Sequence, residues 1–141
     1  MSNFVLDASI ALGWAVDNPE PDGARKVREL FRSGQTAVVP SLWVLEVANG
    51  LIMAERRGKI DAVKIEQARK LYEAMMAKYI EVQPDLYRGA FREIQDIAKR
   101  AQLTAYDAYY VFMAARLSLP LATLDRSLIA SARRLGIGVL S

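Results

Sequence analysis

Short apolar runs alternate along the chain with longer segments in which apolar residues recur every three or four positions. The short runs predict buried strands, and the periodic segments predict amphipathic helices. The predicted strands cover residues 3–7, 36–40, 79–83, 120–125 and 137–140. The predicted helices cover residues 9–16, 24–33, 41–57, 62–78, 85–101, 105–119 and 126–136, and Pro84 stands at the start of the fifth.

Residues that favour helix ends support these boundaries. Side chains that can cap a helix N-terminus are Ser9, Ser41, Asp61 and Thr104, and the glycines that follow helical segments are Gly34 and Gly136. Alternating strands and helices predict an α/β protein whose parallel sheet is covered on both faces. The length of 141 residues fits one domain over 1–141, since domains have roughly 100–200 residues. Ligands of such sheets bind beyond the carboxyl ends of the strands.

Two aspartates follow predicted strands directly. Asp7 lies in "FVLDASIALGW", and Asp125 ends "LATLD". Parallel strands would bring both to the same edge of the sheet. Taken singly, each aspartate can equally be a helix cap, which is a common use of this residue.

Glu46 and Asp107 lie on predicted helices that are apolar almost all round and therefore expected to be buried. In "SLWVLEVANGLIMAERR" the polar gap is a narrow stripe of Glu46, Asn49 and Gly50. An exposed glutamate, or one paired with an arginine, is the alternative interpretation of Glu46. In "TAYDAYYVFMAARL" Asp107 is the only acid, and it has capping-box spacing from Thr104. That capping role is compatible with metal binding.

Four converging carboxylates would repel one another, and a divalent cation would neutralise them. The chain has no cysteine and no histidine, so thiolate or imidazole metal sites and a Ser-His-Asp triad are excluded. Oxygen ligands suit Mg²⁺ or Mn²⁺, and carboxylates around such an ion indicate phosphoryl chemistry. Ser9 stands where an aspartyl-phosphate phosphatase would need a second aspartate, and no P-loop sequence is present.

The net charge of +3 permits a nucleic-acid partner without requiring one. Basic residues that could form a rim for RNA, or simply solvate helix faces, are Arg25, Lys26, Arg28, Arg56, Arg57, Lys59, Lys99, Arg100, Arg126, Arg133 and Arg134. The N-terminus lacks the pattern of a signal peptide, and the longest apolar run is too short to span a bilayer. A cytoplasmic protein without a membrane partner is expected.

Four motifs in order resemble PIN-domain ribonucleases, and among them the VapC-type toxins of toxin–antitoxin pairs. The motifs are "VLDASIALGW", "VPSLWVLEVANGL", "LTAYDAYYVFMAA" and "LATLDRSL". The resemblance covers the whole chain, and it says least about the helix at 61–77, where relatives vary. It implies a three-layer α/β/α sandwich with a central parallel sheet of about five strands.

The resemblance also implies an acidic pocket that holds Mg²⁺ or Mn²⁺. Asp7, Glu46 and Asp107 match the three principal acids, and Asp125 matches a fourth that varies more among relatives. The matching small polar residues that support the pocket are Ser9, Asn49 and Thr104. The implied activity is metal-dependent cleavage of RNA. A non-catalytic PIN fold that binds nucleic acid or a protein, and a DNA nuclease or phosphatase using the same acids, are the alternatives.

The implied partners are an antitoxin protein and a second copy of the chain in a homodimer. An apolar helical face for either contact, or for core packing instead, is offered by Leu71, Tyr72, Met75 and Met76.

Overall fold

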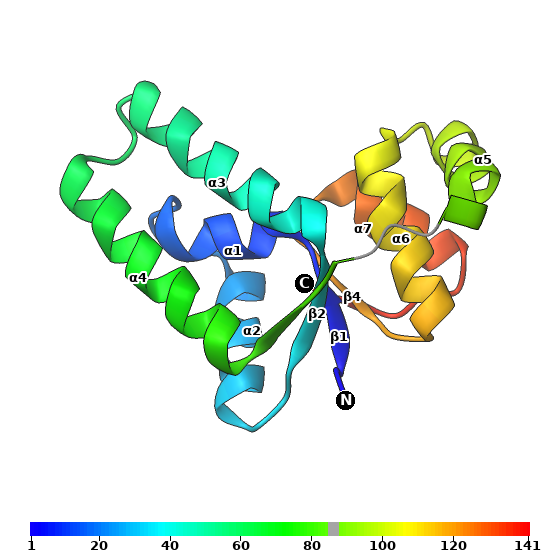
Figure 1. Cartoon of the computed structure of the whole chain (residues 1–141), viewed down its shortest axis with the longest axis horizontal. Coiled ribbons are helices and arrows are strands. Elements are labelled where there is room, and N and C mark those ends of the chain that lie inside the picture. The colour runs from blue at the N-terminus through cyan, green and yellow to red at the C-terminus, as the bar shows by residue number, and fades with distance from the viewer. Residues whose placement is uncertain (85–87) are drawn as a thin grey trace.

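Five parallel strands form one sheet at the centre of the computed structural model, which describes residues 1–84 and 88–141 (Figure 1). The strand order is β3-β2-β1-β4-β5. The strands are β1 (Phe4–Leu6), β2 (Ala37–Pro40), β3 (Ile80–Gln83), β4 (Leu121–Ala122) and β5 (Val139–Leu140). Val5 of β1 is paired with Val38 of β2 on one side and with Leu121 of β4 on the other.

Helices cover both faces of this sheet. The helices before β3 are α1 (Ala8–Ala15), α2 (Asp22–Arg32), α3 (Ser41–Arg56) and α4 (Ala62–Lys78). After β3 follow the 3₁₀ turn η1 (Arg88–Ala90), α5 (Phe91–Ala101), α6 (Ala105–Leu117) and α7 (Arg126–Arg134). The first group lies on one side of the sheet and α5–α7 lie on the other (Figure 1). The three-layer α/β/α fold is therefore confirmed. No helix among the described residues is both long and apolar enough to cross a membrane.

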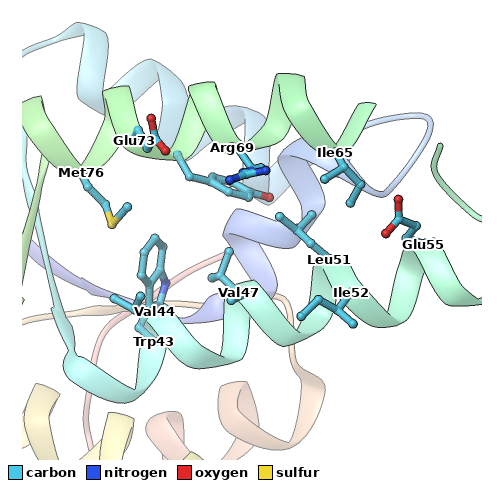
Figure 2. Close-up of a pocket in the computed structure, with 12 residues that line it drawn as sticks. Trp43, Val44, Val47, Leu51, Ile52, Glu55, Ile65, Arg69, Glu73 and Met76 are labelled. Carbon is cyan, nitrogen blue, oxygen red and sulfur yellow. The ribbon is translucent and has the colours of Figure 1, made fainter. Parts of the chain in front are cut away.

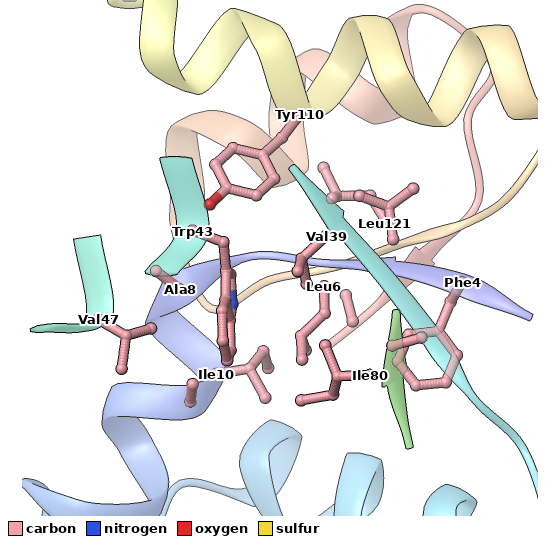
Figure 3. Packing of buried hydrophobic residues seen from close by; sticks show 14 of the residues in the cluster. Phe4, Leu6, Ala8, Ile10, Val39, Trp43, Val47, Ile80, Tyr110 and Leu121 are labelled. Carbon is pink, nitrogen blue, oxygen red and sulfur yellow. The ribbon is translucent and has the colours of Figure 1, made fainter. Parts of the chain in front are cut away.

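The core surrounds the central strand. Every residue of β1 is buried, as expected for a parallel strand covered on both faces. Phe4, Leu6, Ile10 and Trp43 belong to one buried cluster, in which Figure 3 shows Trp43 of α3 beside Ile10 and Phe4 of β1 beside Ile80. On the opposite face α6 buries seven consecutive residues, Ala108–Ala114, which confirms the prediction of a helix buried nearly all round. This helix is therefore held firmly against β1 and β4.

The outer face of α3 differs from its prediction. Val44, Leu45 and Ile52 are exposed, with Leu45 at 73%. The sequence correctly indicated an apolar helix, but only one side of α3 packs on the sheet and its neighbouring helices. The prediction that α3 is buried all round is therefore wrong, because no further layer covers its outer side.

Several boundaries also differ from prediction. The predicted strand at 120–125 is reduced to Leu121–Ala122, because the following backbone leaves the ladder to bond with side chains. Residues 85–87 of the helix predicted at 85–101 lie outside the described residues. The described part of this segment begins with the 3₁₀ turn η1 and becomes α-helical at Phe91. Asp61 and Thr104 cap α4 and α6 as predicted.

The two predicted serine caps are wrong. The N-cap of α3 is Pro40, so Ser41 already belongs to the helix. The N-cap of α1 is Asp7, and Ser9 instead turns its hydroxyl towards the Asp7 carboxylate. The two predicted glycine stops are supported, since Gly34 and Gly136 adopt the positive φ values of 95° and 74°.

Candidate active site

The strand order reverses between β1 and β4, and the carboxyl ends of these strands carry the candidate site. Asp7 follows β1, and Thr123 and Asp125 follow β4. The N–H of Asp7 donates to the carbonyl of Ala122 at 2.9 Å, so the two strand ends are joined. Ligands of parallel α/β sheets bind at such a reversal.

Asp7 is buried, with 5% of its surface exposed, and two hydroxyls hold its carboxylate. Ser9 Oγ donates to Asp7 Oδ2 at 2.6 Å, and Thr123 Oγ1 donates to the same oxygen at 2.8 Å. Each hydroxyl also accepts a backbone N–H, from Leu124 and Asp125 respectively. Burial raises the pKa of Asp7 and the nearby charge of Asp125 adds to the shift, whereas the two hydroxyls oppose it. The carboxylate is thus fixed in place without a neutralising charge.

Glu46 reaches the site from the first turns of α3. It is half-buried, and its Oε1 accepts a hydrogen bond from the Tyr110 hydroxyl at 2.6 Å. Burial raises the pKa of Glu46, and the charges of Asp7 and Asp107 raise it further, while the Tyr110 bond opposes the shift. Burial also raises the pKa of Tyr110, so this hydroxyl stays protonated and remains a donor.

Asp107 lies in the first turn of α6. Its backbone N–H donates to Thr104 Oγ1 at 3.1 Å, so Thr104 fixes the start of the helix that carries the acid. Burial raises the pKa of Asp107, and the charges of Asp7 and Asp125 add to the shift. Thr104 therefore caps α6 as predicted, and the same turn brings Asp107 near the other acids.

Asp125 both caps a helix and faces the acids. Its Oδ1 accepts the backbone N–H groups of Ser127 at 2.8 Å and Leu128 at 3.2 Å, which fixes the start of α7. Its charge raises the pKa of Asp7 and of Asp107. Asn49 behaves differently: it is exposed, and no hydrogen bond joins it to the four acids among the described residues.

The four acids form one electrostatic cluster, and their interactions are repulsive. None of them has an ion pair with a basic side chain in the part of the chain that the structure describes. Their all-oxygen donor set and uncompensated charge fit a hard divalent cation. Within residues 1–84 and 88–141, no three of these side chains are already gathered closely enough to ligate one ion. Joint ligation would therefore require the carboxylates to turn towards each other.

Two residues of the site were missed by the sequence reasoning. Thr123 is fully buried and bonds to Asp7, and Tyr110 bonds to Glu46. A polar residue at the end of an apolar strand was the available signal for Thr123. For Tyr110 the signal was its spacing, since it follows Asp107 by three positions and so shares a helix face with it.

Gly50 has a packing role that the polar stripe on α3 did not indicate. A Cβ at this position would lie 2.6 Å from both terminal methyl carbons of Leu12. Glycine therefore lets the Leu12 side chain of α1 pack directly against α3, the helix that carries Glu46.

A separate apolar groove lies between α3 and α4 (Figure 2). Its volume is about 360 Å³, and its lining includes Trp43, Val47, Leu51, Ile65 and Met76. Of the four residues predicted to form an apolar face on α4, Tyr72 is a core residue, 5% exposed, whose hydroxyl donates to the carbonyl of Ala11 at 2.6 Å. Leu71, Met75 and Met76 are partly buried against the same core.

Comparison with known proteins identifies the family. The crystal structure of PAE2754 from Pyrobaculum aerophilum superposes with a TM-score of 0.72 at 22% sequence identity, covering 99% of this chain and 90% of that one, and so shares the fold. No curated protein sequence matches the chain significantly. The family model described as PIN domain matches residues 4–139. Proteins of this family are typically metal-dependent nucleases. The chain therefore belongs to the PIN domain family.

Proposed function

We propose that this protein is a metal-dependent endoribonuclease and the toxin of a toxin–antitoxin pair. The observation that carries the proposal is the cluster of Asp7, Glu46, Asp107 and Asp125 at the sheet reversal, where their charges repel and no described basic side chain pairs with them. Such a cluster is costly for the fold unless a cation binds to it. The nuclease character of the PIN family supports the reaction class.

The residues would divide the work as follows. Asp7 and Asp107 would be the main ligands of Mg²⁺ or Mn²⁺, and Glu46 would help to hold the ion or orient the attacking water. A bound divalent ion supplies water activation and offsets negative charge on the phosphate. Ser9 and Thr123 hold the Asp7 carboxylate in one orientation. Asp125 would hold a second metal ion or a water, or support the site without touching either.

RNA must approach this acidic site past its negative field, so basic side chains at the rim matter. Arg126 directly follows Asp125 and is exposed. Lys99 and Arg100, also exposed, end α5 just before the turn that leads into α6. Arg126 is the best-placed rim candidate and Lys99 is a second. Arg100 instead lines a pocket with Ala115 and Arg134, near the ends of α6 and α7 that lie away from the acids. If Arg126 and Lys99 contact phosphates, RNA binding should weaken steeply with salt.

Other basic residues considered for the rim are less suitable. Arg25 forms ion pairs with Asp22 and Glu29, and Arg28 forms one with Glu20 at 2.6 Å. Both arginines are therefore already paired with carboxylates of the same chain. Arg56 ends α3 ten residues beyond Glu46, which is about 15 Å along a helix. Distance therefore separates the end of α3 from the acids.

The test is cleavage of a structured RNA with Mg²⁺ or Mn²⁺, in wild type, Asp7→Asn and Asp61→Asn. Asp61 is a matched control, because its exposed carboxylate accepts, among the described residues, only a capping bond from the Lys64 N–H at 2.9 Å. Wild type and Asp61→Asn should cleave, and Asp7→Asn or added chelator should abolish cleavage. Equal cleavage by Asp7→Asn, or in chelator, would refute the proposal. Cleavage of DNA or of small phosphate esters in place of RNA would instead support the alternative hydrolases.

The toxin role predicts two protein partners, an antitoxin and a second copy of the chain in a homodimer. The apolar groove between α3 and α4 and the exposed Leu45 and Ile52 supply surface for protein contacts. Expression of the active chain should arrest growth, and co-expression of a small protein encoded immediately upstream should relieve the arrest. Sedimentation of the isolated chain measures dimerisation. Growth unaffected by an RNA-cleaving protein would exclude the toxin role.

A further inference from the structure

Tyr110 connects the two helix layers at the candidate site. It lies on α6, one turn after Asp107, whereas Glu46 lies on α3 across the end of the sheet. The hydroxyl donates to Glu46 Oε1 at 2.6 Å. Figure 3 shows Tyr110 reaching from α6, with its oxygen directed towards the segment of α3 that carries Trp43. The bond therefore connects α6, which carries Asp107, to α3, which carries Glu46, although the two helices are far apart in the sequence.

The position of the Tyr110 hydroxyl is set by the core. Tyr110 has no exposed surface, and the residues before and after it on α6 are buried as well. A ring packed at interior density has little freedom to change rotamer. The hydroxyl is therefore a fixed donor whose place is determined by the packing of α6 on β1 and β4.

Glu46 has fewer donors to its carboxylate than Asp7 or Asp125 has. Two hydroxyls hold Asp7, and two backbone N–H groups hold Asp125. For Glu46 the bond from Tyr110 is the one hydrogen bond that the described residues provide. Glu46 is only half-buried, so packing alone does not enclose its carboxylate on all sides.

We propose that Tyr110 is a positioning residue for the reaction: it occupies Oε1 of Glu46 and leaves Oε2 free for the metal ion or the attacking water. This inference rests on the proposed nuclease function. Tyr110 acts through Glu46 and touches no reacting atom. By keeping Oε1 occupied, Tyr110 limits the orientations that the Glu46 carboxylate can take when the ion binds, and this lowers the cost of ordering the site.

Tyr110→Phe tests this role, and Tyr72→Phe is its matched control. Tyr72 is also a buried tyrosine with a 2.6 Å hydroxyl bond, but its acceptor is the backbone carbonyl of Ala11. For Tyr110→Phe we expect kcat on RNA to fall roughly tenfold and the Kd for Mn²⁺ to rise several-fold, the scale for losing a hydrogen bond to a charged group. KM for RNA should stay within about twofold, because no phosphate contact is lost. Tyr72→Phe should change Tm alone.

A second comparison guards against a purely structural effect. In the Glu46→Ala background, Tyr110→Phe should produce no further loss of Mn²⁺ affinity, because the acceptor of the Tyr110 hydroxyl is already gone. Equal kcat and equal Mn²⁺ affinity in Tyr110→Phe and Tyr72→Phe would overturn the inference. If wild type binds Mn²⁺ but cleaves no RNA, the proposed function fails, and the Mn²⁺ affinities of the two variants still decide the role of Tyr110.

Discussion

Asp7→Asn should stabilise the protein when no metal is bound. Asp7 is 5% exposed, and its charge contributes to the upward shift of the pKa of Glu46 and of Asp107. Asparagine removes this charge and keeps an acceptor oxygen for the hydroxyls of Ser9 and Thr123. The substitution therefore relieves repulsion while it preserves the shape of the site.

Two opposing effects set the magnitude. Removing a buried charge recovers a desolvation penalty of several kcal/mol. Each of the two hydroxyl bonds to Oδ2 weakens by about 1 kcal/mol when its acceptor becomes neutral. We expect a net increase of about 1–2 kcal/mol in the free energy of unfolding in chelator, which is about 3–8 °C in Tm for a chain of this size.

The pH dependence has a definite sign. Burial raises the pKa of Asp7 in the folded state, so the folded protein binds more protons than the unfolded chain between the two pKa values. The free energy of unfolding of wild type then falls as pH rises through that window and stays lower above it. The advantage of Asp7→Asn should therefore be present near neutral pH and should vanish below the ordinary pKa of aspartate.

Metal should reverse the order of stability. At a Mn²⁺ concentration of about 100 times Kd, binding adds about 2.7 kcal/mol to wild type. It should add little to Asp7→Asn, which lacks a main ligand. Urea unfolding followed by circular dichroism, in chelator and in Mn²⁺, measures both effects, and Asp61→Asn should follow wild type throughout. The reasoning is wrong if Asp7→Asn matches wild type in chelator and responds equally to Mn²⁺.

Two further substitutions examine the supports of the site. Thr123→Val removes a fully buried hydroxyl that bonds to Asp7 and accepts from the Asp125 N–H, so it should cost about 1–3 kcal/mol of stability and reduce RNA cleavage. Thr123→Ser should retain most of the stability and most of the cleavage activity. Urea midpoints and cleavage rates measure these effects, and a Thr123→Val protein that equals Thr123→Ser in both would contradict the prediction. Gly50→Ala would place a Cβ 2.6 Å from the methyl carbons of the partly buried Leu12, so the Leu12 side chain must move and Tm should fall by the equivalent of about 1 kcal/mol. An increase in Tm, the usual result for Gly→Ala inside a helix, would refute the close packing of Leu12 against α3.

The sequence alone was sufficient for the order of elements and for the family. Strand and helix periodicity are local properties, so the alternation, the parallel sheet and the placing of Asp7 and Asp125 after strands could be predicted from neighbouring residues. The caps at Asp61 and Thr104 were predictable for the same reason, since a capping bond spans three residues. Four spaced motifs indicated the PIN domain, and the family model confirmed it.

Only the tertiary structure decided how the acids are held. Thr123 and Asp7 are 116 residues apart, and Tyr110 and Glu46 are 64 apart, so no local pattern connects either pair. Periodicity also shows which residues of a helix are apolar but not what covers them, which is why the outer face of α3 proved exposed. Asp7 could be identified as an unusual charge from its neighbours alone; the hydroxyls that fix it come from both sides of the sheet reversal and meet only in the folded chain.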